Sequence, residues 1–289
     1  QQGAFTSFFG PDPMGLLGVV VLTSLGTWGL PQMVQKFYAI KSERAINTGM
    51  VISTAFAAIV AGGCCFLGGF GRLFSERLDI AADGYDSIIP TMLSGLPDIL
   101  IAIVVILVLS ASMSTLSSLV LASSSTLTLD FLRDNLIKSM SEKAQVFLMR
   151  CLIVVFIAIS VVIAIVQYHS NITFIAQLMG VSWGALAGAF LAPFLYGLYW
   201  KRTTKAACWC SFLFSVAVML ANIFAGSRFP ELLRSPINAG AFCMIAGLII
   251  VPVVSLFTAR PDRMLVESAF SCYDRRVTVR QKEALSDPE

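Results

Sequence analysis

Residues 99–129 read ILIAIVVILVLSASMSTLSSLVLASSSTLTL, an uninterrupted run of 31 residues without a charged side chain. A helix needs about 20 apolar residues to cross the hydrocarbon core of a bilayer, which is roughly 30 Å thick. This run would measure about 46 Å as a straight helix at 1.5 Å per residue, so it must tilt or project beyond the hydrocarbon. The segment therefore predicts a membrane-spanning helix.

Charged residues are scarce and bunched in the rest of the chain as well. They make up 13% of the 289 residues, whereas a soluble domain carries about 25%. Further uncharged windows lie at residues 13–35, 45–71, 151–167, 172–200, 206–227 and 235–259. The window at 151–167 reaches spanning length if Arg150 extends its charged head toward water. The sequence therefore predicts an all-α polytopic membrane protein with seven transmembrane helices, and it argues against a soluble fold.

Basic residues fall mainly on one side of the predicted topology. The flanks of the windows alternate between two sides, and one side receives 16 of the 20 basic residues: Lys36, Lys41, Arg44, Arg133, Lys138, Lys143, Arg150, Lys201, Arg202, Lys205, Arg260, Arg263, Arg275, Arg276, Arg280 and Lys282. Cytoplasmic loops carry the excess of lysine and arginine in membrane proteins. We therefore expect a multi-pass protein of the plasma (cell inner) membrane, with its start outside and its carboxyl terminus in the cytoplasm. The net charge of +3 follows from this topology and indicates no nucleic-acid partner.

The window at 13–35 is interrupted by residues that weaken helices. It contains Gly15, Gly18, Gly26 and Gly29, and Pro31 follows the last glycine closely. Proline removes a backbone donor and clashes with the preceding turn, while glycine lowers helix stability. Transporters use broken helices of this kind to expose backbone carbonyls to their solutes, but glycine and proline are also common in helices that only pack. The residues alone leave both interpretations open.

The middle of the 99–129 run is rich in hydroxyl groups. Six of them fall within nine positions: Ser110, Ser112, Ser114, Thr115, Ser117 and Ser118. Four residues of this stretch recur at helical spacing and share one face: Ala111, Ser114, Thr115 and Ser118. Hydroxyl groups and a freed carbonyl are hard oxygen ligands that suit a small alkali cation. Serine and threonine also hydrogen-bond across packed membrane helices or back to their own helix, and the residues alone favour packing.

Other function classes leave weaker signals. Residues 180–184 (GVSWG) match the GxSxG pattern of serine hydrolases, but that motif requires a strand–turn–helix elbow and a triad, and His169 is the only histidine. A channel would show a filter loop or rings of charge, and none is visible. The windows lack the acids and histidines of a membrane-embedded enzyme, and no CxxC pair indicates a zinc site. We therefore expect neither an enzyme nor a cofactor.

Three motifs resemble those of the sodium:solute symporter family, which includes the sodium/proline, sodium/pantothenate, sodium/glucose and sialic acid symporters. Residues 111–117 (ASMSTLS) are similar to a signature helix of the proline symporters. Residues 29–32 (GLPQ) with 36–39 (KFYA) are similar to the end of the broken helix that precedes it. Residues 197–202 (GLYWKR) are similar to the end of another family helix. The motifs occur in the family's order and spacing.

The resemblance implies a LeuT-type fold, in which two five-helix repeats of opposite topology carry extra helices outside. Residues 1–200 would then form the second inverted repeat, residues 201–259 two peripheral transmembrane helices, and residues 260–289 a cytoplasmic tail. The first repeat, which supplies the other part of the sodium and solute sites, is expected to lie in a missing amino-terminal half of the transporter. The implied activity is sodium-coupled symport of a small organic solute by alternating access.

The family's sodium ligands correspond to residues of the 111–117 motif and the next position. The resemblance implies that sodium, the coupling ion, binds the backbone carbonyl of Ala111 and the hydroxyls of Ser114 and Thr115. Some family members bind a second sodium one turn further on, and Ser117 and Ser118 match those positions.

The solute itself is less well defined by the resemblance. It would be an amino acid such as proline or an organic anion such as pantothenate. Thr27 and Trp28 in the first window and Gln177 in the fifth are weaker candidates for the solute pocket or its gates.

The topology makes a direct prediction for chemical labelling. Single cysteines introduced near Asp83 should react with a membrane-impermeant thiol reagent applied to intact cells, because the basic residues place that loop outside. Cysteines near Lys138 should stay unlabelled until the membrane is made permeable. The reverse labelling pattern would contradict the orientation, and with it the assignment of the second repeat.

Overall fold

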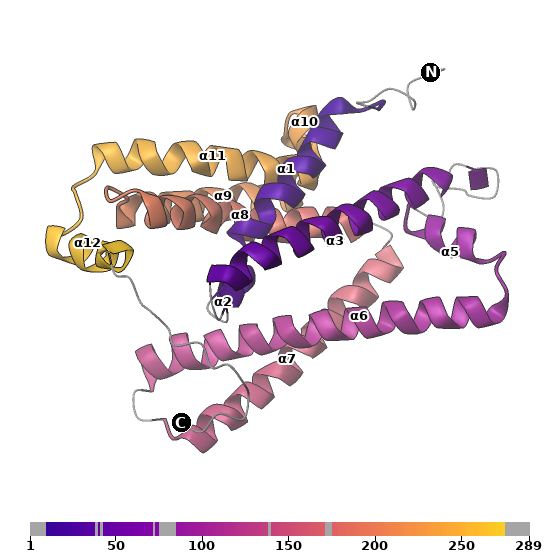
Figure 1. The fold of residues 1–289 in the computed structure, drawn as a ribbon, viewed down its shortest axis with the longest axis horizontal. Helices are drawn as coiled ribbons and strands as arrows, with labels where there is room; N and C mark the ends of the chain where they lie inside the picture. The colour runs from indigo at the N-terminus through magenta and orange to yellow at the C-terminus, as the bar shows by residue number, and fades with distance from the viewer. Residues whose placement is uncertain are drawn as a thin grey trace. The chain divides into compact units, whose positions relative to one another are not determined.

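The computed structural model describes residues 10–37, 40, 43–71, 73–74, 85–137, 140–170 and 175–274. Within these ranges the chain forms helices and turns, and no strand occurs. The α-helices are α1 (Pro13–Gly29), α2 (Pro31–Phe37), α3 (Glu43–Phe70), α5 (Ile88–Leu93), α6 (Asp98–Ser125), α7 (Glu142–Ser170), α8 (Ile175–Tyr199), α9 (Lys205–Ala225), α10 (Glu231–Arg234), α11 (Pro236–Phe257) and α12 (Arg263–Phe270) (Figure 1). A π-helix, η3 (Thr126–Leu136), continues α6, and short 3-10 helices are η2 (Tyr85–Ser87), η4 (Gly226–Arg228) and η5 (Ser271–Asp274).

Each of the uncharged windows contains a long helix. In the described part of the chain, six helices are long and apolar enough to cross a membrane: α3, α6 with η3, α7, α8, α9 and α11. The first window forms α1, an apolar helix of 17 residues. At 1.5 Å per residue α1 is about 26 Å long, slightly short of the hydrocarbon thickness. The all-α, polytopic membrane fold is thus confirmed, while the count of seven spans stays a prediction.

The chain divides into two compact units, which we describe separately. One comprises Gln1–Ala55 and Ala176–Glu289, and the other comprises Phe56–Ile175. The boundaries predicted after residues 200 and 259 separate the second repeat, the peripheral helices and the tail. They do not refer to compact units, and they remain a prediction.

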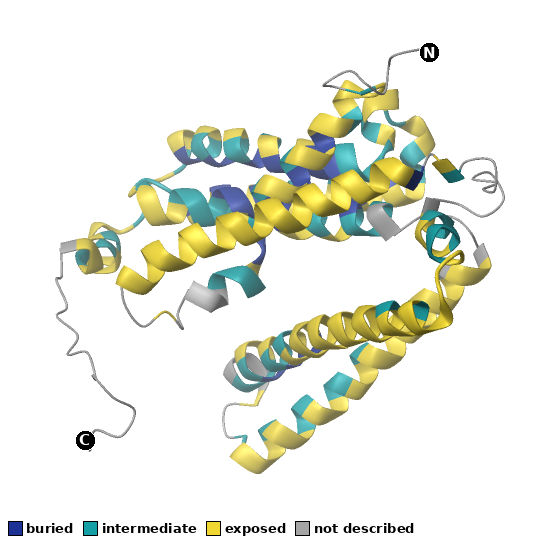
Figure 2. Ribbon diagram, turned by 45° about the vertical axis from the view of Figure 1, so that its right-hand side comes forward, coloured by how far each residue is buried: buried dark blue, intermediate teal, exposed yellow. Residues whose placement is uncertain are grey.

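Helices α1, α8, α9 and α11 pack together in the first unit. A core cluster of Leu22, Ala187, Leu191 and Met244 joins α1, α8 and α11. Buried residues line the faces on which α8, α9 and α11 meet (Figure 2). Lipid tails are as apolar as leucine, so close van der Waals packing rather than the hydrophobic effect holds such helices together in a bilayer.

Glycines bring the backbones of α8 and α11 into contact. Gly180, Gly184 and Gly188 are spaced by four residues, so they lie on one face of α8. A β-carbon added at Gly184 would lie 2.6 Å from the Cα atom of Gly240 on α11. At Gly180 an added β-carbon would lie 2.8 Å from the backbone nitrogen of Ile237. Only glycine allows this approach, which is how small residues bring membrane helices together.

Polar contacts join the opposite ends of these helices, around the turn between α8 and α9. The Thr204 hydroxyl accepts a hydrogen bond from the Ala207 backbone N–H (3.3 Å) and so caps α9. The Thr204 backbone N–H donates to the Ser255 hydroxyl (3.2 Å), and Arg202 Nη2 donates to the Leu256 carbonyl (3.0 Å). These bonds satisfy backbone groups at helix ends that would otherwise lack partners.

In the second unit, α6 contacts α7 and continues into η3, which also contacts α7. Val120, Ser124 and Thr128 recur every four residues and are buried. Over residues 105–119, by contrast, α6 is exposed throughout. The helix therefore packs through its later turns and leaves its middle turns open within this unit.

The α8–α11 crossing predicts opposite effects for two glycine substitutions on the same helix. Gly184→Ala should destabilise the folded chain by about 1–3 kcal/mol, the usual cost of overpacking, because the new methyl group meets the Gly240 backbone. Gly197→Ala is the matched control, since nothing lies within 4 Å of its added β-carbon. It should be neutral or stabilising by up to about 1 kcal/mol, because alanine is the better helix former.

Thermal unfolding of both purified variants in the same detergent measures this difference. Equal melting temperatures for Gly184→Ala and Gly197→Ala would contradict close backbone packing at this crossing.

Candidate functional site

The predicted sodium ligands lie on the open middle turns of α6. Ala111, Ser114, Thr115, Ser117 and Ser118 are all exposed. Successive residues of a helix are rotated by about 100° around its axis. On this basis, all of these residues except Ser117 fall within an arc of about 100° of the helix circumference. Ser117 lies next to Ser114 at its edge. The structure therefore brings the predicted ligands together on one helix face.

The carbonyl of Ala111 is not freed by a break in the helix, because α6 is continuous from Asp98 to Ser125. It instead accepts a second hydrogen bond from the Thr115 hydroxyl, with an oxygen–oxygen distance of 3.1 Å. The Ser118 hydroxyl donates in the same way to the Thr115 carbonyl at 2.8 Å. Back-bonding of this kind is a common alternative use of serine and threonine in helices. It nevertheless places the Ala111 carbonyl and the Thr115 hydroxyl side by side.

This face offers oxygen atoms but no formal charge. Within the described ranges, no group of three or more His, Cys, Asp or Glu side chains could hold a metal ion. Carbonyl and hydroxyl oxygens are hard ligands, which suit hard cations rather than zinc or copper. One helix cannot surround a cation, so further ligands must come from other segments.

The break expected in the first window falls at Leu30. Its backbone is extended (φ −86°, ψ 117°) between the end of α1 at Gly29 and the start of α2 at Pro31. The earlier glycines of the window do not interrupt α1, which is continuous from Pro13 to Gly29. They lie close to neighbouring residues and so allow close packing. Pro31 has no N–H, so the Thr27 carbonyl four residues earlier loses its usual helical partner. The interruption is thus confined to one residue, and its role in exposing carbonyls to a solute stays a prediction.

The break lies against α8 and leaves Trp28 open. A β-carbon at Gly29 would lie 2.8 Å from the Ala187 backbone, so protein covers this side of the irregular segment. Leu30 is buried, whereas the Trp28 side chain is 62% exposed. The Thr27 hydroxyl donates to the Ser24 carbonyl (3.1 Å). Thr27 and Trp28 thus lie in the last turn of α1, directly before the break.

Gln177 does not lie beside this break. It is half-buried in the first turn of α8, and Ala187, the residue that contacts Gly29, follows ten positions later. Ten residues of helix span about 15 Å. The role predicted for Gln177, in the solute pocket or at its gate, stays a prediction.

Two structural features were not anticipated from the sequence. The Thr128 hydroxyl is buried and has no hydrogen-bond partner among the described residues. It lies in the π-helix η3, a rare geometry that is frequent at functional positions. The four-residue spacing of Val120, Ser124 and Thr128 was the available signal in the sequence for the buried face.

The GxSxG pattern at residues 180–184 lies inside continuous α8, so it forms no nucleophile elbow.

Fold and composition define a multi-pass α-helical membrane protein whose candidate sites lie on an oxygen-rich helix and a helix break. Residues 9–215 match the sequence model of the sodium:solute symporter family. The chain belongs to this family. No solved structure matches the chain significantly.

Several curated proteins are similar to this chain. It is 28% identical over 269 residues to the high-affinity proline transporter PutP of Bacillus subtilis, an alignment that covers 91% of the chain and 54% of that transporter. It is 27% identical to the osmoregulated proline transporter OpuE of the same organism, over 83% of the chain and 47% of OpuE. A sodium/proline symporter of Staphylococcus aureus is 29% identical, over 67% of the chain and 38% of the relative. The chain spans about half the length, or less, of these relatives.

Proposed function

We propose that this chain forms part of a sodium-coupled symporter whose solute is a proline-like amino acid. Membership of the sodium:solute symporter family supports sodium as the coupling ion. The similar proteins named above are proline transporters, which favours an amino acid over the organic anion pantothenate. Because the family consists of transporters, we infer no catalytic role and no cofactor beyond the coupling ion.

The observation that carries this proposal is the pair of oxygens formed by the Ala111 carbonyl and the Thr115 hydroxyl. They lie 3.1 Å apart on an exposed turn of α6. When sodium binds, the Thr115 hydroxyl turns its proton away from the carbonyl, and both oxygens then face the cation. Ser114, one residue earlier on the same side of the helix, supplies a third oxygen. Ser117 and Ser118 form a second sodium site at the next turn.

Three oxygens from one helix are too few for a dehydrated cation, since burying an uncompensated charge costs many kcal/mol. The alignments with the similar transporters cover only 54% and 47% of those proteins. We infer that the first repeat, in an amino-terminal half of the transporter, contributes a broken helix whose carbonyls complete the shell. This arrangement makes the sodium site a junction between the two repeats, as expected for a transporter built from inverted repeats.

The solute site is proposed at the break between α1 and α2. Transporters bind solutes with the unwound carbonyls and half-helix ends of discontinuous helices, and irregular backbone is tolerated at membrane depth only where protein or a water-filled cavity covers it. The Thr27 carbonyl lacks a helical partner, so it is free to accept a hydrogen bond from the ammonium or imino group of an amino acid. The exposed Trp28 ring offers an apolar surface to the solute's side chain.

Transport then proceeds by alternating access in the plasma membrane, with the start of the chain outside and its carboxyl terminus in the cytoplasm. Sodium stabilises the state that accepts the solute, and by thermodynamic reciprocity the solute tightens sodium binding by the same factor. The membrane potential adds about 2.3 kcal/mol per elementary charge for every 100 mV. The sodium gradient and this potential together drive solute accumulation.

The sodium site is tested by alanine substitutions in an intact transporter that contains this segment. Ser114→Ala and Thr115→Ala should each weaken the apparent sodium affinity of solute uptake by roughly 5- to 150-fold, because losing a buried polar partner costs about 1–3 kcal/mol. Ser123→Ala is the control, since Ser123 is exposed on the same helix two turns beyond the site. If all three variants kept the wild-type sodium dependence, the hydroxyls would serve helix packing only.

A second prediction concerns these 289 residues on their own. Reconstituted in liposomes, they should show no saturable, sodium-driven proline uptake, because the site needs ligands from the first repeat. Co-reconstitution with a chain that carries the first five helices should restore uptake. Saturable uptake by the 289 residues alone would contradict the proposal and would indicate that copies of this chain complete the site for one another.

A further inference from the structure

A pocket of about 290 Å³ lies between α8 and α9, near the turn that joins them. Its lining is apolar apart from one cation, and it includes Phe190, Pro193, Lys205, Cys208, Trp209 and Phe212. The aromatic side chains contact each other edge to face: the Phe190 and Phe212 ring centroids lie 6.0 Å apart, and those of Trp209 and Phe212 lie 5.7 Å apart. An apolar pocket with a single cation at its margin suits a ligand with an apolar body and an anionic head.

Lys205 lies at the start of the candidate membrane span formed by α9. It is the first residue of the helix, directly after the Thr204 cap, and it is exposed. Trp209 follows four positions later on the same face, and its side chain is 54% exposed. Tryptophan is enriched at the level of the lipid headgroups. We therefore expect the pocket to extend from the headgroup level at Lys205 toward the hydrocarbon.

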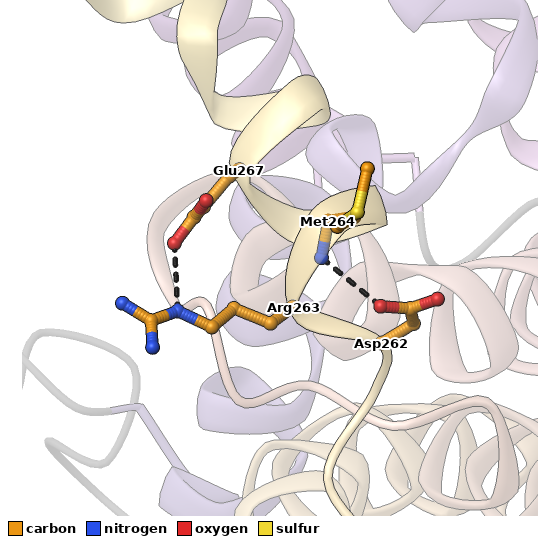
Figure 3. A network of polar contacts seen from close by, with 4 residues as sticks. All are labelled: Asp262, Arg263, Met264 and Glu267. Carbon is orange, nitrogen blue, oxygen red and sulfur yellow. Dashed lines mark hydrogen bonds and ion pairs between the residues drawn. The ribbon is translucent and has the colours of Figure 1, made fainter.

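The Lys205 ammonium group is not neutralised by an acidic neighbour in the described residues. No Asp or Glu occurs in the sequence between Glu142 and Glu231. The acids of α12 and its cap are engaged locally (Figure 3): Glu267 pairs with Arg263 at 2.8 Å, and Asp262 accepts from the Met264 backbone N–H at 3.0 Å.

The other two cations of the same turn have partners of their own. Arg202 donates to the Leu256 carbonyl (3.0 Å), and Lys201 Nζ lies 5.4 Å from the centroid of the Phe270 ring. Both of these contacts are to neutral groups, and neither residue lines the pocket, so Lys205 is the cation that the pocket itself offers to an anion.

We propose that this pocket binds one anionic phospholipid, with its phosphate on Lys205 and one acyl chain against Phe190, Trp209 and Phe212. A free phosphate would engage only the lysine and leave the apolar lining without a partner, so the lining argues for a lipid. Basic pockets between membrane helices on the cytoplasmic side bind anionic headgroups. The orientation proposed above puts Lys205 in that leaflet, but the binding chemistry itself does not depend on transport.

Trp209 provides a probe within the pocket. The full chain is placed in phosphatidylcholine bilayers, and increasing fractions of brominated phosphatidylglycerol or brominated phosphatidylcholine are added to quench tryptophan fluorescence. The chain has four tryptophans, so the difference between wild type and Trp209→Phe isolates the Trp209 signal. We expect half-maximal quenching of Trp209 at a several-fold lower fraction of the anionic lipid than of the zwitterionic lipid. Both leaflets have the same composition, so the result is independent of orientation and of sodium-coupled uptake.

Charge variants show whether Lys205 is responsible for this preference. Lys205→Gln should abolish it, and Lys205→Arg should retain it. Lys143→Gln is the matched control, because Lys143 is an exposed lysine in the first turn of α7. Equal quenching by the two lipids in the wild type, or a preference that survives Lys205→Gln, would overturn the proposal. Loss of the preference on adding millimolar inorganic phosphate would also overturn it, since the site would then recognise a free anion.

Discussion

The bilayer core contains no water to satisfy backbone N–H and C=O groups, and this constraint shapes the whole structure. A spanning segment must satisfy its backbone internally, which is why the uncharged windows all form helices. Leu30, between α1 and α2, is an extended residue that separates two helical segments. It is buried, and the adjoining Gly29 packs against the Ala187 backbone. The irregular backbone is therefore covered by protein on one side, as the constraint requires.

The two compact units use small residues in different ways. In the first, glycines on α8 and α11 bring two backbones into contact, and hydroxyls such as that of Thr204 satisfy helix ends. In the second, the small and polar residues of α6 face outward over its middle turns. Residues that only pack are expected to be buried, as Ser124 is in the same helix. Ser114 and Thr115 are exposed together with all of residues 105–119, so their hydroxyls can contact an ion or another segment of the transporter.

The sequence predicted most of the fold because hydropathy and helix geometry depend on local composition. The long helices and the shared face of Ala111 and Thr115 follow from spacing alone, whereas the glycines and Pro31 of the first window left open whether its helix breaks. The start of α7 at Glu142 was not predicted. The uncharged window begins only after Arg150, but a helix can continue past a charged residue into water. The π-helix after Ser125 and the separation of Gln177 from the break depend on contacts between distant segments. No local pattern specifies such contacts, so sequence reasoning could not predict them.

In the proposed transporter, sodium on α6 and an amino acid at the α1–α2 break stabilise the same state. Equilibrium binding of radioactive sodium and radioactive proline to an intact transporter that contains this chain, each with and without the other ligand, tests it directly. We expect each ligand to raise the affinity for the other by the same factor, and we expect that potassium does not replace sodium. A sodium affinity that stays unchanged at saturating proline would show that the two sites are not coupled.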